Sequence, residues 1–97
     1  MGELGKMHYI YIVECKGKTF YTGWTTDLVK RIKKHNTGEG AKYTRGRTPV
    51  VLKYYEEFQQ KSDALKRERE IKKMPRSKKN RLIDSFDPKD NFDKLFD

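Results

Sequence analysis

Three segments carry the hydrophobic pattern of β-strands, because β-branched and aromatic residues dominate them or alternate with polar ones. They are residues 8–15, 19–24 and 50–58. The stretch 16–18 between the first two is short, and Gly17 within it can adopt a positive φ. The first two strands therefore form a predicted hairpin.

The pairing of this hairpin has two solutions. A loop of residues 16–18 pairs Cys15 with Thr19 and makes Tyr11 diagonal to Tyr21, whereas a longer loop or a bulge can place the two tyrosines directly opposite each other. In either register Tyr9 shares one face of the sheet with Tyr11 and Tyr21. Paired tyrosines in a strand are usually packing residues, so spacing alone does not distinguish packing from catalysis.

Three further segments have the apolar spacing of helices. They are residues 25–38, 63–74 and 76–86. Thr26 or Asp27 can cap the first of these, and Gly38 lies just past its end. Leu28 and Ile32 form its inward stripe.

The second helix is expected to begin after Ser62, whose side chain can cap it, and to end at Pro75. The third then places Leu82 and Ile83 inward. The order β-β-α-β-α-α predicts an α+β domain, in which helices flank a small antiparallel three-stranded sheet. We expect one domain over residues 1–83, and residues 84–97, which hold five Asp against two Lys, to form a separate acidic tail.

The formal charge of +9 and the pI near 9.7 are the features of the composition that most directly indicate a function. A domain of 97 residues with this charge usually binds a polyanion, and nucleic acid is the first candidate. An anionic membrane surface is disfavoured, because the basic helix has only a narrow apolar stripe that the core requires. The sequence has no apolar run long enough to span a membrane and one cysteine, Cys15, which we interpret as a core residue. A reducing, cytoplasmic location fits these features.

Glu68 is the unexpected residue of the second helix. It shares a face with Ala64 and Ile71, so it points toward the core although the rest of the helix is mostly cationic. An ion pair with Arg31 or hydrogen bonds from tyrosine hydroxyls would compensate the carboxylate without a metal, and a divalent cation is the alternative. Arg31 and His35 lie one turn apart on the first helix, where a solvated basic face is the simpler interpretation.

These residues, taken in order, carry a resemblance. The stretches Tyr9-Ile10-Tyr11 and Tyr21-Thr22-Gly23, followed by a helix with Arg31 and His35, resemble the signature of the GIY-YIG endonuclease superfamily. The similarity extends from about residue 8 to 83 and is greatest to small stand-alone members of the URI-like branch, which share stretches like "AKYTRGRTP" and "ALKREREIK". Two positions depart from the signature, since Tyr9 replaces its first Gly and Thr22 its second Ile.

The resemblance implies a metal-dependent endonuclease that hydrolyses phosphodiester bonds in DNA. Glu68 would bind a single Mg²⁺ or Mn²⁺ ion. Tyr11 would accept or relay the proton of the attacking water, and Tyr21 would orient that water or the phosphate. Arg31 would stabilise negative charge, and His35 would assist proton transfer. Asn80 lies in the region where the family often has an Asn near the site.

Eight cations in the predicted loop 39–49 and the later helices suit contacts to phosphates, which position a nucleic acid without reading its sequence. They are Lys42, Arg45, Arg47, Lys72, Lys73, Arg76, Lys78 and Lys79. A module of the same fold that binds nucleic acid with little or no cleavage is the alternative function. A third possible function is an adaptor that uses its acidic tail and basic body for protein contacts. If the protein is a nuclease, a protein partner can supply its target specificity.

Overall fold

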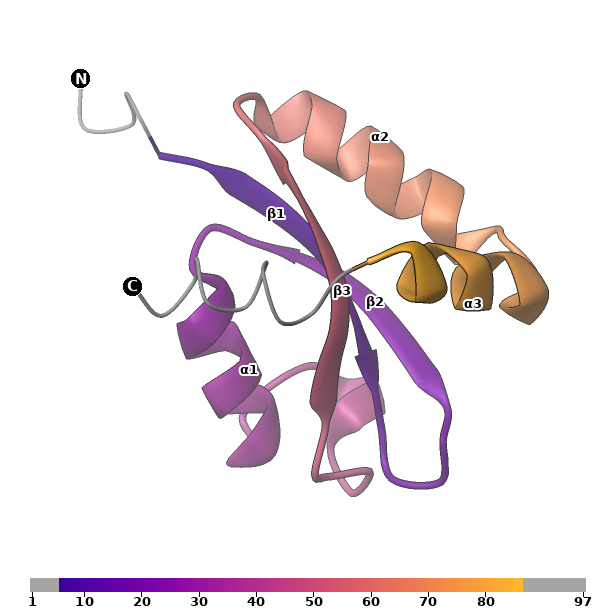
Figure 1. The fold of residues 1–97 in the computed structure, drawn as a ribbon. Coiled ribbons are helices and arrows are strands. Elements are labelled where there is room, and N and C mark those ends of the chain that lie inside the picture. The colour runs from indigo at the N-terminus through magenta and orange to yellow at the C-terminus, as the bar shows by residue number, and fades with distance from the viewer. Residues whose placement is uncertain (1–5, 87–97) are drawn as a thin grey trace.

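The computed structural model describes residues 6–86, which follow the predicted order β-β-α-β-α-α (Figure 1). The elements are β1 His8–Glu14, β2 Phe20–Thr25, α1 Leu28–Asn36, the short 3₁₀ helix η1 Lys42–Thr44, β3 Val51–Phe58, α2 Lys61–Lys72 and α3 Arg76–Ser85. The predicted α+β fold is confirmed. Most of the predicted acidic tail, residues 87–97, lies outside the described residues.

Within residues 6–86 the strands form one antiparallel sheet in the order β2-β1-β3. The hairpin adopts the register with the loop 16–18, since the Cys15 amide donates to the Thr19 carbonyl at 2.7 Å. Tyr11 consequently lies opposite Gly23 and diagonal to Tyr21. Gly17 has a φ of +89°, as its place in the loop predicts.

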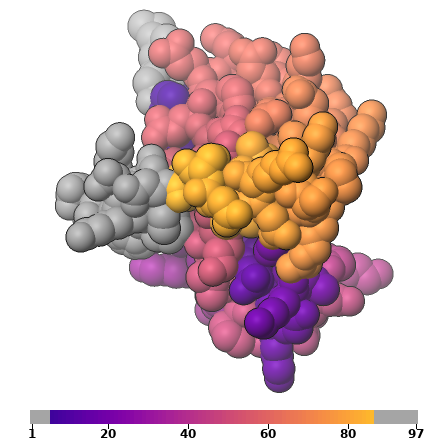
Figure 2. Space-filling model, turned by 45° about the vertical axis from the view of Figure 1, so that its right-hand side comes forward, coloured from indigo at the N-terminus to yellow at the C-terminus, as the bar shows by residue number. Residues whose placement is uncertain are grey.

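The central strand β1 is buried on both faces, and it divides the core into two layers. Ile10 and Ile12 pack against α2 and α3, where Ala64 and Ile71 are buried beside them. Tyr11 and other residues of the opposite face pack against α1. Figure 1 shows α1 on one side of the sheet and α2 and α3 on the other, and Figure 2 shows α3, in yellow, lying alongside the orange α2.

The helix ends agree with most of the sequence signals. Asp27 caps α1 by accepting a hydrogen bond from the Lys30 amide at 3.1 Å, and Gly38 follows the helix with a φ of +84°. The prediction that Ser62 caps α2 was wrong. The helix begins at Lys61, so Ser62 lies in its first turn and Gln60 is the capping position. Local propensity does not distinguish caps one or two residues apart when packing sets where a helix begins.

Two polar contacts attach the helices to the sheet. Asn36, the last residue of α1, accepts from the Val50 amide at 2.6 Å and donates to the Val50 carbonyl at 3.2 Å. This contact brings the loop 39–49 back beneath α1. On the other face, Nε of Arg67 in α2 donates to both carboxylate oxygens of Glu56 in β3 at 3.1 Å. Arg67 thereby fixes the rotation of α2 and the position of the neighbouring Glu68.

Candidate active site

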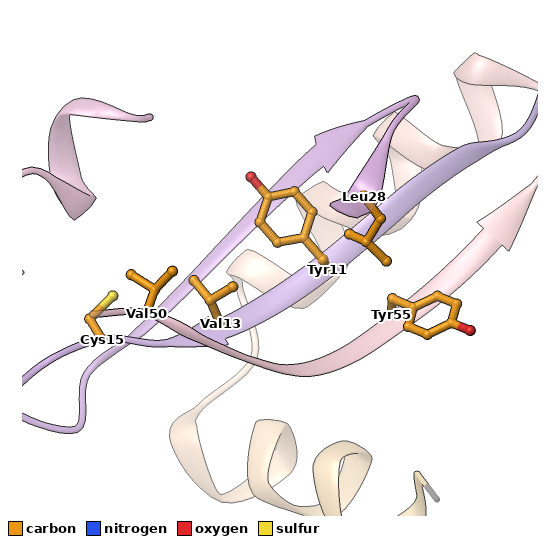
Figure 3. Packing of buried hydrophobic residues seen from close by; sticks show 6 residues of the cluster. All are labelled: Tyr11, Val13, Cys15, Leu28, Val50 and Tyr55. Atoms are coloured by element: carbon orange, nitrogen blue, oxygen red, sulfur yellow. The ribbon is translucent and has the colours of Figure 1, made fainter. Parts of the chain in front are cut away.

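Tyr11 occupies the centre of the candidate site. It is fully buried in the middle of β1, and its ring passes over Gly23 of the neighbouring edge strand. A Cβ atom on Gly23 would lie 2.5 Å from the Tyr11 hydroxyl oxygen, so only glycine leaves space for the ring. Figure 3 shows the Tyr11 ring directed toward β2, whereas the Tyr55 hydroxyl points to the opposite side. The tyrosine oxygen thus reaches the edge of the sheet, where side chains of other elements meet it.

His35 meets this oxygen from α1. It is fully buried, and its Nε2 lies 2.8 Å from the Tyr11 hydroxyl oxygen. Its Nδ1 lies 2.7 Å from the Thr44 hydroxyl of η1. Gly40 packs against the imidazole so closely that a Cβ atom there would overlap Nδ1. The returning loop therefore clamps the ring from one side, and the tyrosine contacts it from the other.

The single proton of the Thr44 hydroxyl sets the direction of each hydrogen bond. Thr44 donates that proton to the Ala41 carbonyl at 2.9 Å, so its oxygen accepts from Nδ1–H of His35. A neutral imidazole then has a bare Nε2, to which the Tyr11 hydroxyl donates. Burial, together with the charge of Arg31, lowers the pKa of His35 to about 4. Burial raises the pKa of Tyr11 to about 12, although Arg31 opposes it. At neutral pH the imidazole is neutral and the phenol is protonated.

Arg31 and Tyr21 complete the polar group around Tyr11. Arg31 lies one turn before His35 on α1, and its Nε donates to the Tyr11 oxygen at 3.3 Å. This hydrogen bond is the main reason that the pKa of the Arg31 guanidinium is raised, and Tyr21 contributes to it. The ring of Tyr21 packs edge-on to His35, with centroids 5.5 Å apart. The structure thus brings these four predicted residues together from β1, β2 and α1.

Glu68 approaches the same group from α2. Its side chain is 16% exposed, and its negative charge contributes to the raised pKa of Tyr11. The ion pair that the sequence suggested with Arg31 is not the one formed, because Lys72 lies one turn along α2, with its Nζ 3.6 Å from a Glu68 oxygen. Lys72 is half exposed and pairs through a single long contact, so the carboxylate is only partly compensated.

The chemistry of Glu68 suits a divalent metal ion that shares its ligands with water and substrate. Among residues 6–86, no three His, Cys, Asp or Glu side chains come together as a group that could hold a metal ion. Mg²⁺ is commonly held by one or two carboxylates, waters and substrate phosphates, and Glu68 supplies one such carboxylate beside a protein surface rich in cations. Glu68 is therefore the described residue that would hold the ion.

The predicted phosphate-binding cations come from two parts of the chain, η1 with the loop after it, and α2 to α3. Arg47 lies over the ring of Tyr43 near η1, with its Cζ 4.3 Å from the ring centroid. Arg76 of α3 lies over the Phe20 ring at 4.1 Å. Lys79 is partly buried. The remaining cations of this set are exposed, and they are Lys42, Arg45, Lys72, Lys73 and Lys78. Asn80 is exposed on α3.

Sequence reasoning missed the residues that position Tyr11 and His35. Thr44 and Gly40 were not singled out, and Gly23 was quoted within a motif without its role beneath Tyr11. Gly23 alone could have been identified, because the loop 16–18 places it opposite Tyr11. Thr44 and Gly40 could not, since their relation to His35 depends on how the loop 39–49 folds back.

Comparisons with known proteins show which family the chain resembles. The model of the GIY-YIG catalytic domain matches residues 7–81. The chain belongs to the GIY-YIG family. A UPF0213 protein of Clostridium perfringens is 54% identical over 89 residues, which are 91% of this chain and 96% of that protein. A UPF0213 protein of Halobacterium salinarum is 53% identical over 77 residues, which are 79% of this chain and all of the relative.

Solved structures show the same fold. The solution structure of a UPF0213 protein from Bacillus halodurans shares 50% identity with a TM-score of 0.54, over 80% of this chain and 83% of the other. That of an Enterococcus faecalis protein shares 40% identity with a TM-score of 0.58, over 84% and 86%. GIY-YIG domains form a nuclease superfamily that acts on nucleic acid and generally depends on a divalent metal ion. No helix of this GIY-YIG protein within residues 6–86 is long and apolar enough to cross a membrane.

Proposed function

We propose that this GIY-YIG protein is an endonuclease that hydrolyses phosphodiester bonds in DNA, with Tyr11 as the group that receives the proton of the attacking water. The observation that carries the proposal is the position of the Tyr11 oxygen. It donates to His35 and accepts from Arg31, which leaves its oxygen one further lone pair for a water proton. A buried tyrosine hydroxyl needs one hydrogen-bond partner in any role, whereas the Tyr11 hydroxyl has two, and one of them is the cation of Arg31.

The proton path follows from the hydrogen-bond directions. As the water oxygen bonds to phosphorus, one water proton passes to the Tyr11 oxygen and the tyrosine proton passes to Nε2 of His35. One phosphorus–oxygen bond to the sugar breaks, and the leaving oxygen takes a proton from solvent. Tyr11 with a pKa near 12 is a poor source of free phenolate at neutral pH, so a relay suits it better than prior ionisation. The negative charge of a bound phosphate favours protonated His35 and so assists the transfer.

The charged residues around this path have separate tasks. Arg31 stabilises the negative charge that develops on the phosphate oxygens. Tyr21, packed against His35, orients the water or the phosphate. Glu68 would hold the divalent ion, which when bound supplies positive charge to the phosphate and the leaving oxygen.

A nicking assay with three variants tests this function. Purified protein is incubated with supercoiled plasmid and with branched and single-stranded oligonucleotides, in Mg²⁺ or Mn²⁺. Tyr11→Phe should lower the cleavage rate by about 100-fold or more, the range for a general acid–base group. Glu68→Gln should abolish metal-dependent cleavage and any rise of Tm with Mn²⁺, while DNA binding persists. Tyr55→Phe is the matched control, because it removes a hydroxyl that points away from Tyr11 in the same sheet, and it should cleave like the parent.

Parent-level cleavage by the Tyr11→Phe protein would overturn the role of Tyr11. A parent protein that binds DNA but cuts none of these substrates in either metal would support the binding module instead.

A further inference from the structure

A hollow of about 220 Å³ lies along the free edge of β2, beside the candidate active site. Its walls combine aromatic rings with cations: Phe20, Tyr21, Thr22 and Tyr43, with Lys72 of α2 and Lys79 of α3. Tyr21 belongs to the hollow and to the site, and Lys72 is the partner of Glu68. A ligand in this hollow therefore lies next to the reacting phosphate.

Tyr43 gives the hollow an open aromatic surface. It is 39% exposed, which is unusual for a large ring among the described residues. Its plane is 20° from that of Tyr21, with centroids 5.8 Å apart, so the two rings overlap only in part and form a step. Arg47 holds the Tyr43 ring, through its guanidinium 4.3 Å from the centroid and a 2.6 Å hydrogen bond from Nη1 to the Tyr43 carbonyl. Arg47 does not line the hollow, so the ring surface for a base is the part toward the hollow that Tyr21 leaves uncovered.

A second hollow, of about 400 Å³, lies at the other end of β2 and differs in chemistry. Lys30, Arg31 and Lys34 of α1 line it together with Lys6 and the turn that follows β2. None of its described lining residues is aromatic. It suits phosphate groups and offers no surface for a base.

Strand β2 connects the two hollows through the active site. Thr25 lines the cationic hollow, Gly23 lies beneath the Tyr11 ring, and Phe20 lines the aromatic one. At about 3.3 Å per residue, the five steps from Phe20 to Thr25 span about 17 Å. One nucleic acid strand can follow this edge, with phosphates at one end and a base at the other.

We propose that the aromatic hollow is a nucleobase subsite, in which an unpaired base next to the scissile phosphate stacks on Tyr43 while Lys72 and Lys79 bind the flanking phosphates. The subsite rests on the proposed function, because it takes nucleic acid as the substrate. The subsite adds a preference for substrate structure. The nucleotide that lies in the aromatic hollow, next to the scissile phosphate, must be unstacked from the duplex. Duplex DNA without an unpaired nucleotide there makes the phosphate contacts only.

The test uses a DNA duplex with a short single-stranded overhang that contains 2-aminopurine, whose fluorescence falls when it stacks. Binding is measured in EDTA, so the result is independent of cleavage. The parent should quench the overhang probe. Tyr43→Leu should lose the quenching and bind the overhang about 5- to 100-fold more weakly, the range for loss of one base–aromatic stack, with fully paired duplex unaffected. Tyr43→Phe keeps the ring and should behave like the parent.

A Lys30→Ala, Lys34→Ala double variant is the control for charge. It should weaken binding of both probes and keep the quenching of the bound overhang, because its hollow contacts phosphates alone. Equal weakening of overhang and duplex by Tyr43→Leu would overturn the subsite, since a general contact or a folding defect acts on both. An absence of quenching with the parent at saturating protein would also overturn it. Failure of the proposed function would instead appear as a parent that does not nick DNA in Mg²⁺ or Mn²⁺.

Discussion

At the scale of single residues, the Thr44 hydroxyl sets which way the proton of the proposed relay can move. The Thr44 hydroxyl donates its hydrogen bond to the Ala41 carbonyl. His35 must therefore donate from Nδ1–H to Thr44, and its unprotonated Nε2 accepts from Tyr11. With the opposite tautomer, Nε2 would carry a proton and could not receive one from Tyr11. Thr44 is therefore a positioning residue for the relay.

Thr44→Val tests this role, since it replaces the hydroxyl by a methyl group of similar shape. We expect His35 to shift toward the Nε2–H tautomer, which ¹⁵N chemical shifts of the imidazole distinguish. Loss of the buried partner should cost about 1–3 kcal/mol in the free energy of unfolding, and cleavage should fall while DNA affinity holds. Thr44→Ser keeps the hydroxyl and should restore tautomer and rate. An unchanged tautomer in the Val variant would show that Thr44 does not set it.

At the scale of elements, the candidate active site depends on strand pairing, which places Gly23 beneath the Tyr11 ring. The loop 16–18 fixes the register, and the register puts Gly23 opposite Tyr11. Helix α1 then offers Arg31 and His35 from consecutive turns, and α2 adds Glu68 from the other side of the sheet edge. A shift of β2 by two residues would place Tyr21 opposite Tyr11, and its side chain would fill the space that Gly23 leaves for the Tyr11 ring.

Gly23→Ala should show this dependence on register. A strand with Ala in place of Gly gains about 0.5–1 kcal/mol of intrinsic stability, so a purely local effect would be stabilising. We expect the opposite, a loss of about 1–3 kcal/mol, because the new Cβ overlaps the Tyr11 hydroxyl and forces the ring aside. Urea unfolding gives the stability, and the ¹⁵N shift of His35 Nε2 reports whether Tyr11 still donates to it. A variant that is more stable than the parent and cleaves equally well would refute the overlap.

At the scale of the whole molecule, a net charge of +9 gives general affinity for a polyanion, and the fold decides where that affinity is concentrated. Lys30, Arg31 and Lys34 of α1 line the hollow at one end of β2. Lys72 of α2 and Lys79 of α3 line the hollow at the other end, where Arg47 lies over the Tyr43 ring. Both hollows along the edge strand therefore have cations in their walls.

DNA affinity should therefore depend on which lysines are removed and not only on how many. Lys78→Ala with Lys79→Ala should flatten the dependence of log K on log salt by about two phosphate contacts, at ~0.9 per contact. Lys33→Ala with Lys66→Ala removes the same charge from exposed positions on α1 and α2 that line neither hollow. That control should change the slope much less. Fluorescence anisotropy across a salt series measures both, and equal slopes for the two pairs would mean that the fold does not concentrate the affinity.

The sequence by itself determined the elements, their order and the inward faces. These follow from residue periodicity and short-range turn chemistry, so β1, the hairpin loop and the stripe of Leu28 and Ile32 could be predicted. The ordered motifs also identified Tyr11, Tyr21, Arg31, His35 and Glu68 as candidates. The structure brings the first four into one group and places Glu68 close enough for its charge to act on Tyr11.

Only the tertiary structure decided what these candidates contact. The partner of Glu68 is Lys72 rather than Arg31, and the acceptor for His35 is Thr44 from a loop that Asn36 folds back against β3. Such contacts depend on where a loop closes and how a helix rotates on the sheet. Loop closure and helix rotation each depend on many weak interactions between residues distant in the sequence, and no local sequence pattern encodes them. The shift of the pKa of His35 to about 4 has the same origin, because burial is a property of the assembled core.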